Sequence, residues 1–228
     1  MHGGVKIALE LLAGGTGTFG AAAAPSVGEL MRRRRWQRLW RTFPSLAEMR
    51  VLDLGGTPAG WAGAPVLPAR LTLVNPCALG DLPEGMEHVA ADACELPDEL
   101  LRQEWDLVYS NSVIEHVGGH ARRERFAEAV RSCAPSHWVQ TPYRYFPIEP
   151  HWMFPGFQFL PVRARRSVAM RWPLHPGRRD DPDVALEEVL DIELIARTEM
   201  RRYFPGSELF VERLGGLPKS IVAIRADG

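Results

Sequence analysis

Short apolar runs recur along most of the chain and alternate with stretches that have helical spacing. The runs predict strands over residues 51–54, 71–75, 88–92, 105–110 and 137–140. A helical pattern occupies residues 122–133, and Pro135 marks its end. Because strands and helices alternate, we expect an α/β fold with a doubly wound, mainly parallel sheet.

The N-terminal part of the chain has a different pattern. Residues 5–12 predict a short helix, and residues 14–25 are mostly Gly, Ala and Thr, which indicates a linker or a lid that orders on binding. Residues 27–43 predict an amphipathic helix, which the basic block Arg32–Arg35 interrupts. We interpret this block as a solvated face, with phosphate or acidic lipid as the alternative partner. We therefore expect residues 1–48 to form a helical and flexible extension.

Residues 141–183 break the alternation of strand and helix. They are rich in proline and aromatic residues, so we expect an inserted lid over the ligand crevice. Helical spacing returns over 184–202, and residues 209–213 and 220–225 predict an antiparallel pair of strands at the sheet edge. The prediction is a Rossmann-like sheet of seven strands with an antiparallel last strand, in one domain over 49–228.

The composition excludes several classes of protein. A formal net charge of −1 provides no field for a polyanion, so no nucleic-acid partner is expected. Three cysteines without CxxC spacing indicate neither a disulfide framework nor a zinc knuckle, and they fit a reducing compartment. No apolar run approaches the ~20 residues that cross a bilayer. We therefore expect a cytoplasmic protein without a membrane span.

The first strand passes directly into a glycine-rich turn. Asp53 is followed by Gly55, Gly56, Thr57 and Gly60. Glycines at the carboxyl end of a buried strand let the backbone approach a ligand closely, and a nucleotide site begins at this place in an open parallel sheet. The alternative interpretation is a plain turn between a strand and a helix.

Further spaced motifs follow the turn: Asn75, Ala91–Ala93, Asp106–His116 and Gly216–Ile224. Together with residues 53–60 they resemble class I S-adenosylmethionine-dependent methyltransferases of the broad type 11 sort. The similarity runs from about residue 50 to the C-terminus. The resemblance implies methyl transfer with S-adenosylmethionine as the cofactor, S-adenosylhomocysteine as the product and a small molecule as the acceptor.

The resemblance also implies roles for the first two strand ends. The glycine turn would wrap the amino-acid tail of the cofactor, with Asp53 beneath its ammonium group or orienting the loop. In the family an acidic residue at the end of the second strand accepts both ribose hydroxyls, but here the position holds Asn75. An amide accepts one hydrogen bond and donates another, so ribose binding is expected with weaker charge assistance. The same position argues against a site for NAD, which expects Asp or Glu there.

The next two strand ends complete the predicted cofactor site. The resemblance implies that Asp92 accepts the adenine amino group and that the Ala93 amide faces a ring nitrogen. As an alternative, Asp92 caps a turn near Pro97. Ser110 and Asn111 end the fourth strand, where cofactor and acceptor should meet, and we expect both to line the crevice.

Glu115 and His116 are expected in the first turns of the following helix, near the reactive methyl group. In some relatives a Glu-x-x-Glu-His pattern binds a divalent metal with help from another histidine, but here Ser112 replaces the first Glu. A site of Glu115, His116 and His151 would lack one hard oxygen ligand. We therefore expect a metal-free site, with metal binding as the less favoured alternative and a purely structural His116 as another.

The start of the predicted lid carries the candidate catalytic residues. His151 suits removal of a hydroxyl proton during attack on a sulfonium, since an imidazole titrates near pH ~6.5. Glu149 would orient His151 or bind the acceptor, and His116 would assist from the start of the helix after the fourth strand. Tyr143, Tyr145 and Trp152 are candidate walls of the acceptor pocket. The alternative is that this segment only packs a rigid lid.

The favoured function is methyl transfer to a hydroxyl oxygen of a sugar, a lipid-linked molecule or a secondary metabolite. The alternatives are an N- or C-methyltransferase and a cofactor-binding protein without catalysis, because the fold alone does not select the acceptor atom. Apolar residues on the helix over 27–43 make a homodimer a further expectation.

Overall fold

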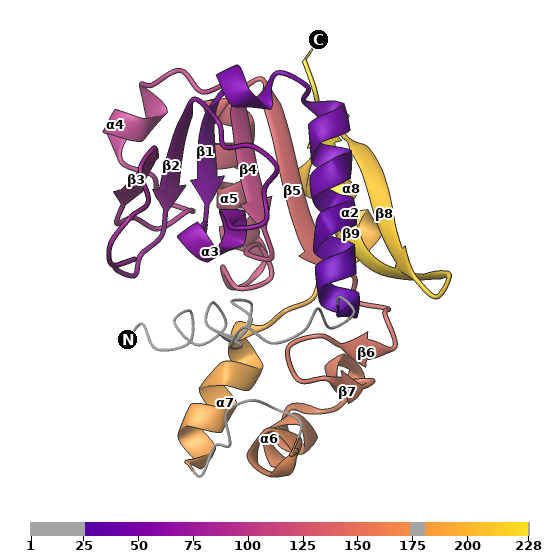
Figure 1. Ribbon diagram of the computed structural model, residues 1–228. Helices are drawn as coiled ribbons and strands as arrows, with labels where there is room; N and C mark the ends of the chain where they lie inside the picture. Colours follow the sequence, from indigo (N-terminus) through magenta and orange to yellow (C-terminus); the bar gives the residue numbers. More distant parts are fainter. Residues whose placement is uncertain (1–25, 174–180, 228) are drawn as a thin grey trace, which may run out of the picture.

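The computed structural model describes residues 26–173 and 181–227. Its centre is a seven-stranded sheet in the order β3-β2-β1-β4-β5-β9-β8, with helices on both faces (Figure 1). The strands are β1 (Arg50–Leu54), β2 (Arg70–Val74), β3 (Met86–Val89), β4 (Leu107–Asn111), β5 (Ser136–Pro142), β8 (Glu208–Leu214) and β9 (Leu217–Arg225). Pairs from β3 to β5 are parallel, whereas β9 is antiparallel to both β5 and β8. The predicted mainly parallel sheet with an antiparallel last strand is confirmed.

The helix α2 (Val27–Thr42) covers one face of the sheet. Ser26 starts it with a capping box, in which the Ser26 side chain accepts from the Glu29 amide and Glu29 accepts from the Ser26 amide. Its buried residues Trp36 and Leu39 pack against strand residues that include Val51. The apolar pattern over 27–43 therefore seals a sheet face within the chain, and the predicted homodimer stays a prediction.

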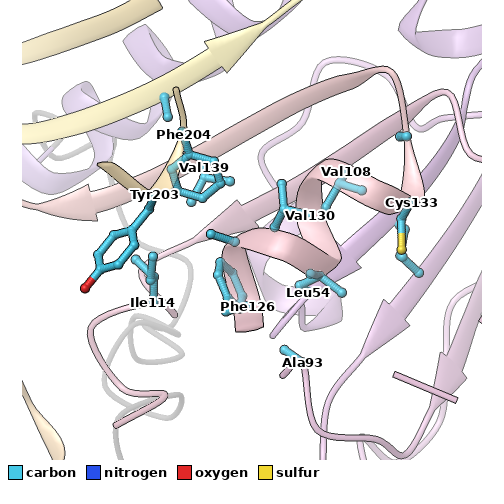
Figure 2. Close-up of a cluster of buried hydrophobic side chains, with 14 of the residues drawn as sticks. Leu54, Ala93, Val108, Ile114, Phe126, Val130, Cys133, Val139, Tyr203 and Phe204 are labelled. Atoms are coloured by element: carbon cyan, nitrogen blue, oxygen red, sulfur yellow. The ribbon is translucent and has the colours of Figure 1, made fainter. Parts of the chain in front are cut away.

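The opposite face is covered by α5 (His120–Cys133) and α8 (Arg197–Tyr203). Phe126 and Val130 of α5 pack into a cluster with residues of the central strands (Figure 2). Successive side chains of a strand point to opposite faces, so Leu52 belongs to this cluster whereas Val51 belongs to the cluster under α2. The central strands are therefore buried on both sides, as their unbroken apolar runs require.

The helix predicted over 184–202 is two helices, α7 (Pro182–Asp191) and α8. The segment between them is extended because it pairs with other loops. The Glu193 amide donates to the carbonyl oxygen of Glu115 at 2.9 Å, and the Arg144 amide donates to that of Ile195 at 3.1 Å. Helical spacing alone does not reveal such an interruption, so the prediction of one continuous helix was wrong.

The segment after β5 forms a small lobe at the carboxyl ends of the parallel strands (Figure 1). It contains β6 (Ile148–Glu149), β7 (Phe154–Pro155), the 3-10 turn η2 (Phe157–Phe159), α6 (Val162–Arg171) and α7. Trp152, Phe157, Ala169 and Val189 form its own apolar core. We call this lobe the lid. Because α7 contributes to that core, the lid reaches Asp191 in the structure.

The remaining helical elements are single turns: η1 (Leu46–Glu48), α3 (Pro58–Trp61) and α4 (Asp98–Leu101). Among the helices within 26–173 and 181–227, none has both the length and the apolar character needed to cross a bilayer. The elements predicted over 5–12 and 14–25 lie outside the described residues.

Candidate active site

The turn after β1 requires glycine at its first position. Gly55 has a φ of +81°, a conformation that side chains disfavour. A Cβ at this position would lie 2.3 Å from the Val113 side chain, and a Cβ at Gly56 would lie 2.2 Å from the Asp53 carboxylate. The loop after β4 therefore packs directly against the glycine turn.

Asp53 is buried beneath this turn and binds the next element. Its carboxylate accepts a hydrogen bond of 2.7 Å from Trp61 Nε1, and burial raises the pKa of Asp53 to about 7. Thr57 caps α3 by accepting from the Gly60 amide at 3.3 Å. Of the two roles anticipated for Asp53, the structure displays the orienting one, and the contact with a cofactor ammonium stays a prediction.

Asn75 lies at the end of β2 and is fully buried. Its Nδ2 donates to the Gly56 carbonyl oxygen at 3.2 Å, and its Oδ1 accepts from the Cys77 amide at 3.0 Å. The side chain thus joins the turn after β1 to the turn after β2. The contact between Asn75 and the ribose of a cofactor stays a prediction, and it would be a second role beside this one.

Asp92 follows β3 and is partly exposed. It accepts from the Cys94 amide at 2.8 Å and from Arg122 Nη2 at 2.5 Å. Burial alone would raise the pKa of Asp92, but these hydrogen bonds outweigh it and hold the pKa below its ordinary value. Ala93 beside it is buried. The anticipated turn cap therefore exists, with Cys94 as the donor, and sequence reasoning missed Arg122.

The two residues that end β4 have different surroundings. The Ser110 hydroxyl is buried and donates to the Leu54 carbonyl oxygen at 2.8 Å, so it joins β4 to β1. The Ser110 hydroxyl is therefore used inside the sheet, and the predicted place of Ser110 in the crevice stays a prediction. Asn111 is partly exposed and accepts from Arg35 Nη1 at 2.5 Å.

Arg35 corrects the interpretation of the arginine block. Arg32, Arg33 and Arg34 are exposed, as expected of a solvated face, but Arg35 is nearly buried and forms a bidentate ion pair of 2.9 and 2.6 Å with Glu212 of β8. The spacing contained a signal for this, since Arg35 lies one turn from the buried Met31 and one turn from Leu39.

Glu115 and His116 lie in the turn between β4 and α5 rather than in the helix, which begins at His120. The Glu115 side chain is fully buried, and its Oε2 accepts from Thr141 Oγ1 at 3.0 Å. Its Oε1 has no hydrogen-bond partner among the residues that the structure describes. Burial raises the pKa of Glu115 to about 7.

The lid brings His151 onto His116. Their Nε2 atoms are 3.2 Å apart, with the rings at 88°. Behind His151, its Nδ1 lies 2.6 Å from Glu149 Oε1, and the other oxygen of Glu149 accepts from the Trp152 amide at 2.7 Å. Burial and His151 lower the pKa of His116 to about 3, whereas Glu149 outweighs burial and raises the pKa of His151.

The three aromatic residues predicted to bind the acceptor do not share one environment. Trp152 is 1% exposed and stacks on Phe157 at 4.9 Å, so of its two anticipated positions, pocket wall and lid core, it occupies the lid core. Tyr145 is exposed and has ring contacts with Tyr143 at 5.5 Å and with Phe159 at 6.1 Å. Tyr143 and Tyr145 remain candidates for acceptor binding.

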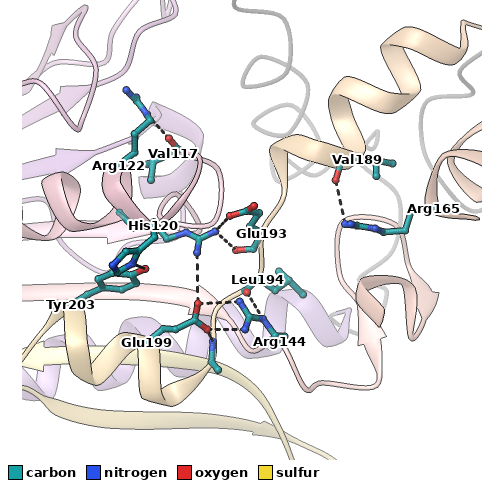
Figure 3. A network of polar contacts seen from close by, with 12 residues as sticks. Val117, His120, Arg122, Arg144, Arg165, Val189, Glu193, Leu194, Glu199 and Tyr203 are labelled. Carbon is teal, nitrogen blue, oxygen red and sulfur yellow. Dashed lines mark hydrogen bonds and ion pairs between the residues drawn. The ribbon is translucent and has the colours of Figure 1, made fainter. Parts of the chain in front are cut away.

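A polar network holds the base of the lid (Figure 3). Arg144, just after β5, donates to the Leu194 carbonyl oxygen at 2.7 Å and to Glu199 of α8 at 3.1 Å. The buried Arg123 of α5 pairs with Glu193 and Glu199. Both ends of the lid are therefore tied to the helices behind the sheet.

Comparison with known proteins identifies the fold. No family model and no curated protein matches the chain. Among solved structures, a "possible exported protein" from Bordetella parapertussis is 13% identical with a TM-score of 0.54, covering 98% of this chain and 79% of its own. The N-terminal domain of EvdMO1 with SAH bound matches over 98% of this chain and 95% of its own, at 16% identity and a TM-score of 0.51. The chain has the class I methyltransferase fold. Small RNA methyltransferase HEN1 matches over 94% of this chain and 27% of its own, at 16% identity and a TM-score of 0.52.

Proposed function

We propose that this chain transfers the methyl group of S-adenosylmethionine to a hydroxyl oxygen of a small molecule. The observation that carries the proposal is the line Glu149, His151 and His116, because its last residue lies in the loop that packs against the glycine turn. Val113, next to that turn, precedes Glu115 and His116 by only a few residues. A cofactor held by the turn would therefore present its methyl group near the histidines.

The cofactor assignment rests on the class I fold and on the glycine turn with its buried Asp53. EvdMO1, which shares the fold at low identity, is described with SAH bound. The side chains of Asn75 and Asp92 stand at the ends of β2 and β3, where the ribose and adenine are proposed to bind. Asn111 stands at the end of β4, between these positions and the acceptor side.

Removal of the acceptor proton is assigned to the histidine pair. Methyl transfer from a sulfonium is a displacement that needs alignment and loss of the hydroxyl proton. His151 is held by Glu149 in one orientation, with its Nε2 directed at His116. Tyr143 and Tyr145 are the proposed walls for the acceptor.

The test separates binding from turnover. S-adenosylhomocysteine at about 100 times its Kd should raise stability by ~2.7 kcal/mol, and NAD should not. Transfer of labelled methyl to a panel of hydroxylated small molecules should fall by ~10²-fold or more in His151→Ala with cofactor binding retained. His120→Ala, a histidine exposed on α5, is the matched control and should keep full turnover. Stabilisation by NAD alone, or full turnover in His151→Ala, would overturn the proposal.

Acceptor amines and carbon acids belong in the same panel, because they test the alternatives. Labelled methyl on nitrogen or carbon would replace the hydroxyl assignment. Cofactor binding without any transfer across the panel favours the cofactor-binding protein.

A further inference from the structure

Three potential metal ligands converge where the lid meets the sheet. Glu115 and His116 come from the turn after β4, and His151 comes from the turn between β6 and β7. One ligand atom from each residue lies within 4.8 Å of the other two. Segments far apart in the sequence thus place two imidazoles and a carboxylate around one point.

The separation of the two imidazoles matches a shared ion. Two histidine nitrogens bound to one tetrahedral metal, each at ~2.0–2.1 Å, lie about 3.3 Å apart. The Nε2 atoms of His116 and His151 are 3.2 Å apart.

The free carboxylate oxygen provides an independent observation. Glu115 is fully buried, and its Oε1 has no hydrogen-bond partner within the described parts of the chain. A buried oxygen of this kind is costly unless something binds it. Thr141 already satisfies Oε2, so the unsatisfied atom is the one left for an ion.

Contacts behind the ligands have the arrangement that metal sites use. A ligating histidine usually donates its other ring nitrogen to a carboxylate, which orients the ring. Glu149 Oε1 lies 2.6 Å from His151 Nδ1 and fills this position. Glu149 is itself anchored by the Trp152 amide, so the ring orientation is set by the lid core.

We propose that Glu115, His116 and His151 bind one divalent ion of the borderline class, such as Zn²⁺ or Co²⁺, in preference to Mg²⁺. Two imidazole nitrogens and one carboxylate oxygen suit these ions, whereas Mg²⁺ demands oxygen ligands in octahedral geometry. The residue that would add a hard oxygen is Ser112, whose hydroxyl instead donates to Gln140 Oε1 at 3.0 Å.

Three protein ligands leave room in the coordination shell for an acceptor oxygen. A bound ion of this class lowers the pKa of a hydroxyl beside it. This role rests on the proposed function, whereas the metal site itself does not. With an ion bound, His151 would hold the ion instead of removing the acceptor proton, and that proton would pass to solvent.

The experiment is titration of chelator-treated protein with Co²⁺, monitored by visible absorption and by calorimetry. One Co²⁺ per chain should bind, Zn²⁺ should displace it, and Mg²⁺ at the same concentration should not. Affinity should fall by ~10²-fold or more in His116→Gln and in Glu115→Gln. His120→Ala is the control, because His120 pairs with Glu124 on the exposed surface of α5 and should leave binding unchanged.

Each outcome has one meaning. Absence of stoichiometric Co²⁺ and Zn²⁺ binding, or unchanged affinity in both variants, overturns the metal site, and equal competition by Mg²⁺ overturns the proposed preference for Zn²⁺ or Co²⁺. Thermal unfolding of His116→Gln and Glu115→Gln shows whether a loss of Co²⁺ affinity reflects misfolding. If these variants are misfolded, His151→Gln takes their place, and Co²⁺ binding retained by His151→Gln would overturn the site. Full methyl transfer by metal-free protein overturns the catalytic role of the ion but leaves the proposed function intact. Metal binding without methyl transfer to any acceptor overturns the proposed function but leaves the metal site intact.

Discussion

The ion pair between α2 and β8 provides the sharpest test of how the extension is joined to the domain. Arg35 and Glu212 are 13% and 5% exposed, and two hydrogen bonds of 2.9 and 2.6 Å connect them. Replacing Arg35 with Met keeps the length of the side chain but leaves a buried carboxylate that retains, among the described residues, a hydrogen bond from the Ser220 hydroxyl and the nearby charge of Lys219. Breaking a buried pair in this way costs ~3–5 kcal/mol, which in a chain of this size corresponds to a Tm lower by roughly 6–20 °C.

The assay is urea unfolding of Arg35→Met, of Glu212→Leu and of the double variant. The double variant replaces the pair with two apolar side chains and should recover to within about 1 kcal/mol of the original protein or exceed it. Arg34→Met, an exposed arginine next to Arg35, is the control and should change stability by less than ~0.5 kcal/mol. A cost below ~1 kcal/mol for Arg35→Met, or additive costs in the double variant, would refute the assignment of a coupled buried pair.

The effect should depend on pH in one direction. Burial alone would raise the pKa of Glu212, but Arg35 outweighs it and holds the pKa below its ordinary value of 4.5. The stabilisation is therefore present above that value and is lost as the pH falls through the lower folded-state pKa. The difference between Arg35→Met and the original protein should shrink in acid, and a difference that grows there would contradict the account.

Three further predictions concern the glycine turn and the histidine line. Gly55→Ala should abolish S-adenosylhomocysteine binding in calorimetry because its Cβ collides with Val113, whereas Gly80→Ala, with a φ of +69° and nothing within 4 Å, should bind normally; equal losses would contradict this. Burial raises the pKa of Asp53 to about 7, so the folded state holds a proton there, and the stability this provides is full below pH ~4 and is lost as pH rises through about 7. Asp53→Asn should therefore gain up to about 4 kcal/mol relative to the original protein between pH ~4 and ~8 in urea unfolding, and a constant difference would exclude an ionising Asp53. Glu149→Gln should lower kcat of methyl transfer by ~10-fold or more while the Kd for S-adenosylhomocysteine is unchanged, and an unchanged kcat would remove Glu149 from the positioning of the histidine.

The strands β1, β2 and β4 could be predicted because they are buried on both faces and are mainly apolar. Leu52 and Val108 lie in one apolar cluster, whereas Val51 and Leu107 lie in the other. The strand positions in both clusters can be predicted from the hydrophobicity of the residues alone. The interruption between α7 and α8 could not be predicted in this way, because it depends on hydrogen bonds that residues 193 and 195 form with loops far away in the sequence.

The candidate site divides along the same line. The glycine turn is local, and its chemistry can be read from the order of residues around Gly55. The partners that hold the site are distant in sequence: Trp61 beneath Asp53, Arg122 on Asp92 and Arg35 on Asn111. Ser110 was assigned to the crevice because it lies near the carboxyl end of β4. The direction of its hydroxyl, however, depends on the Leu54 carbonyl oxygen of the neighbouring strand.

Trp152 explains how the lid and the chemistry depend on each other. Its ring lies in the lid core, while its amide anchors the same Glu149 carboxylate that orients His151. His116 and Glu115 belong to the sheet side, so the cluster is complete only when the folded lid rests on the ends of the strands. The hydrogen bonds from Arg144 to Leu194 and Glu199 hold the lid there. It follows that the packing of the lid core and the position of His151 are set together, and that Trp152 and Phe157 serve the site through packing.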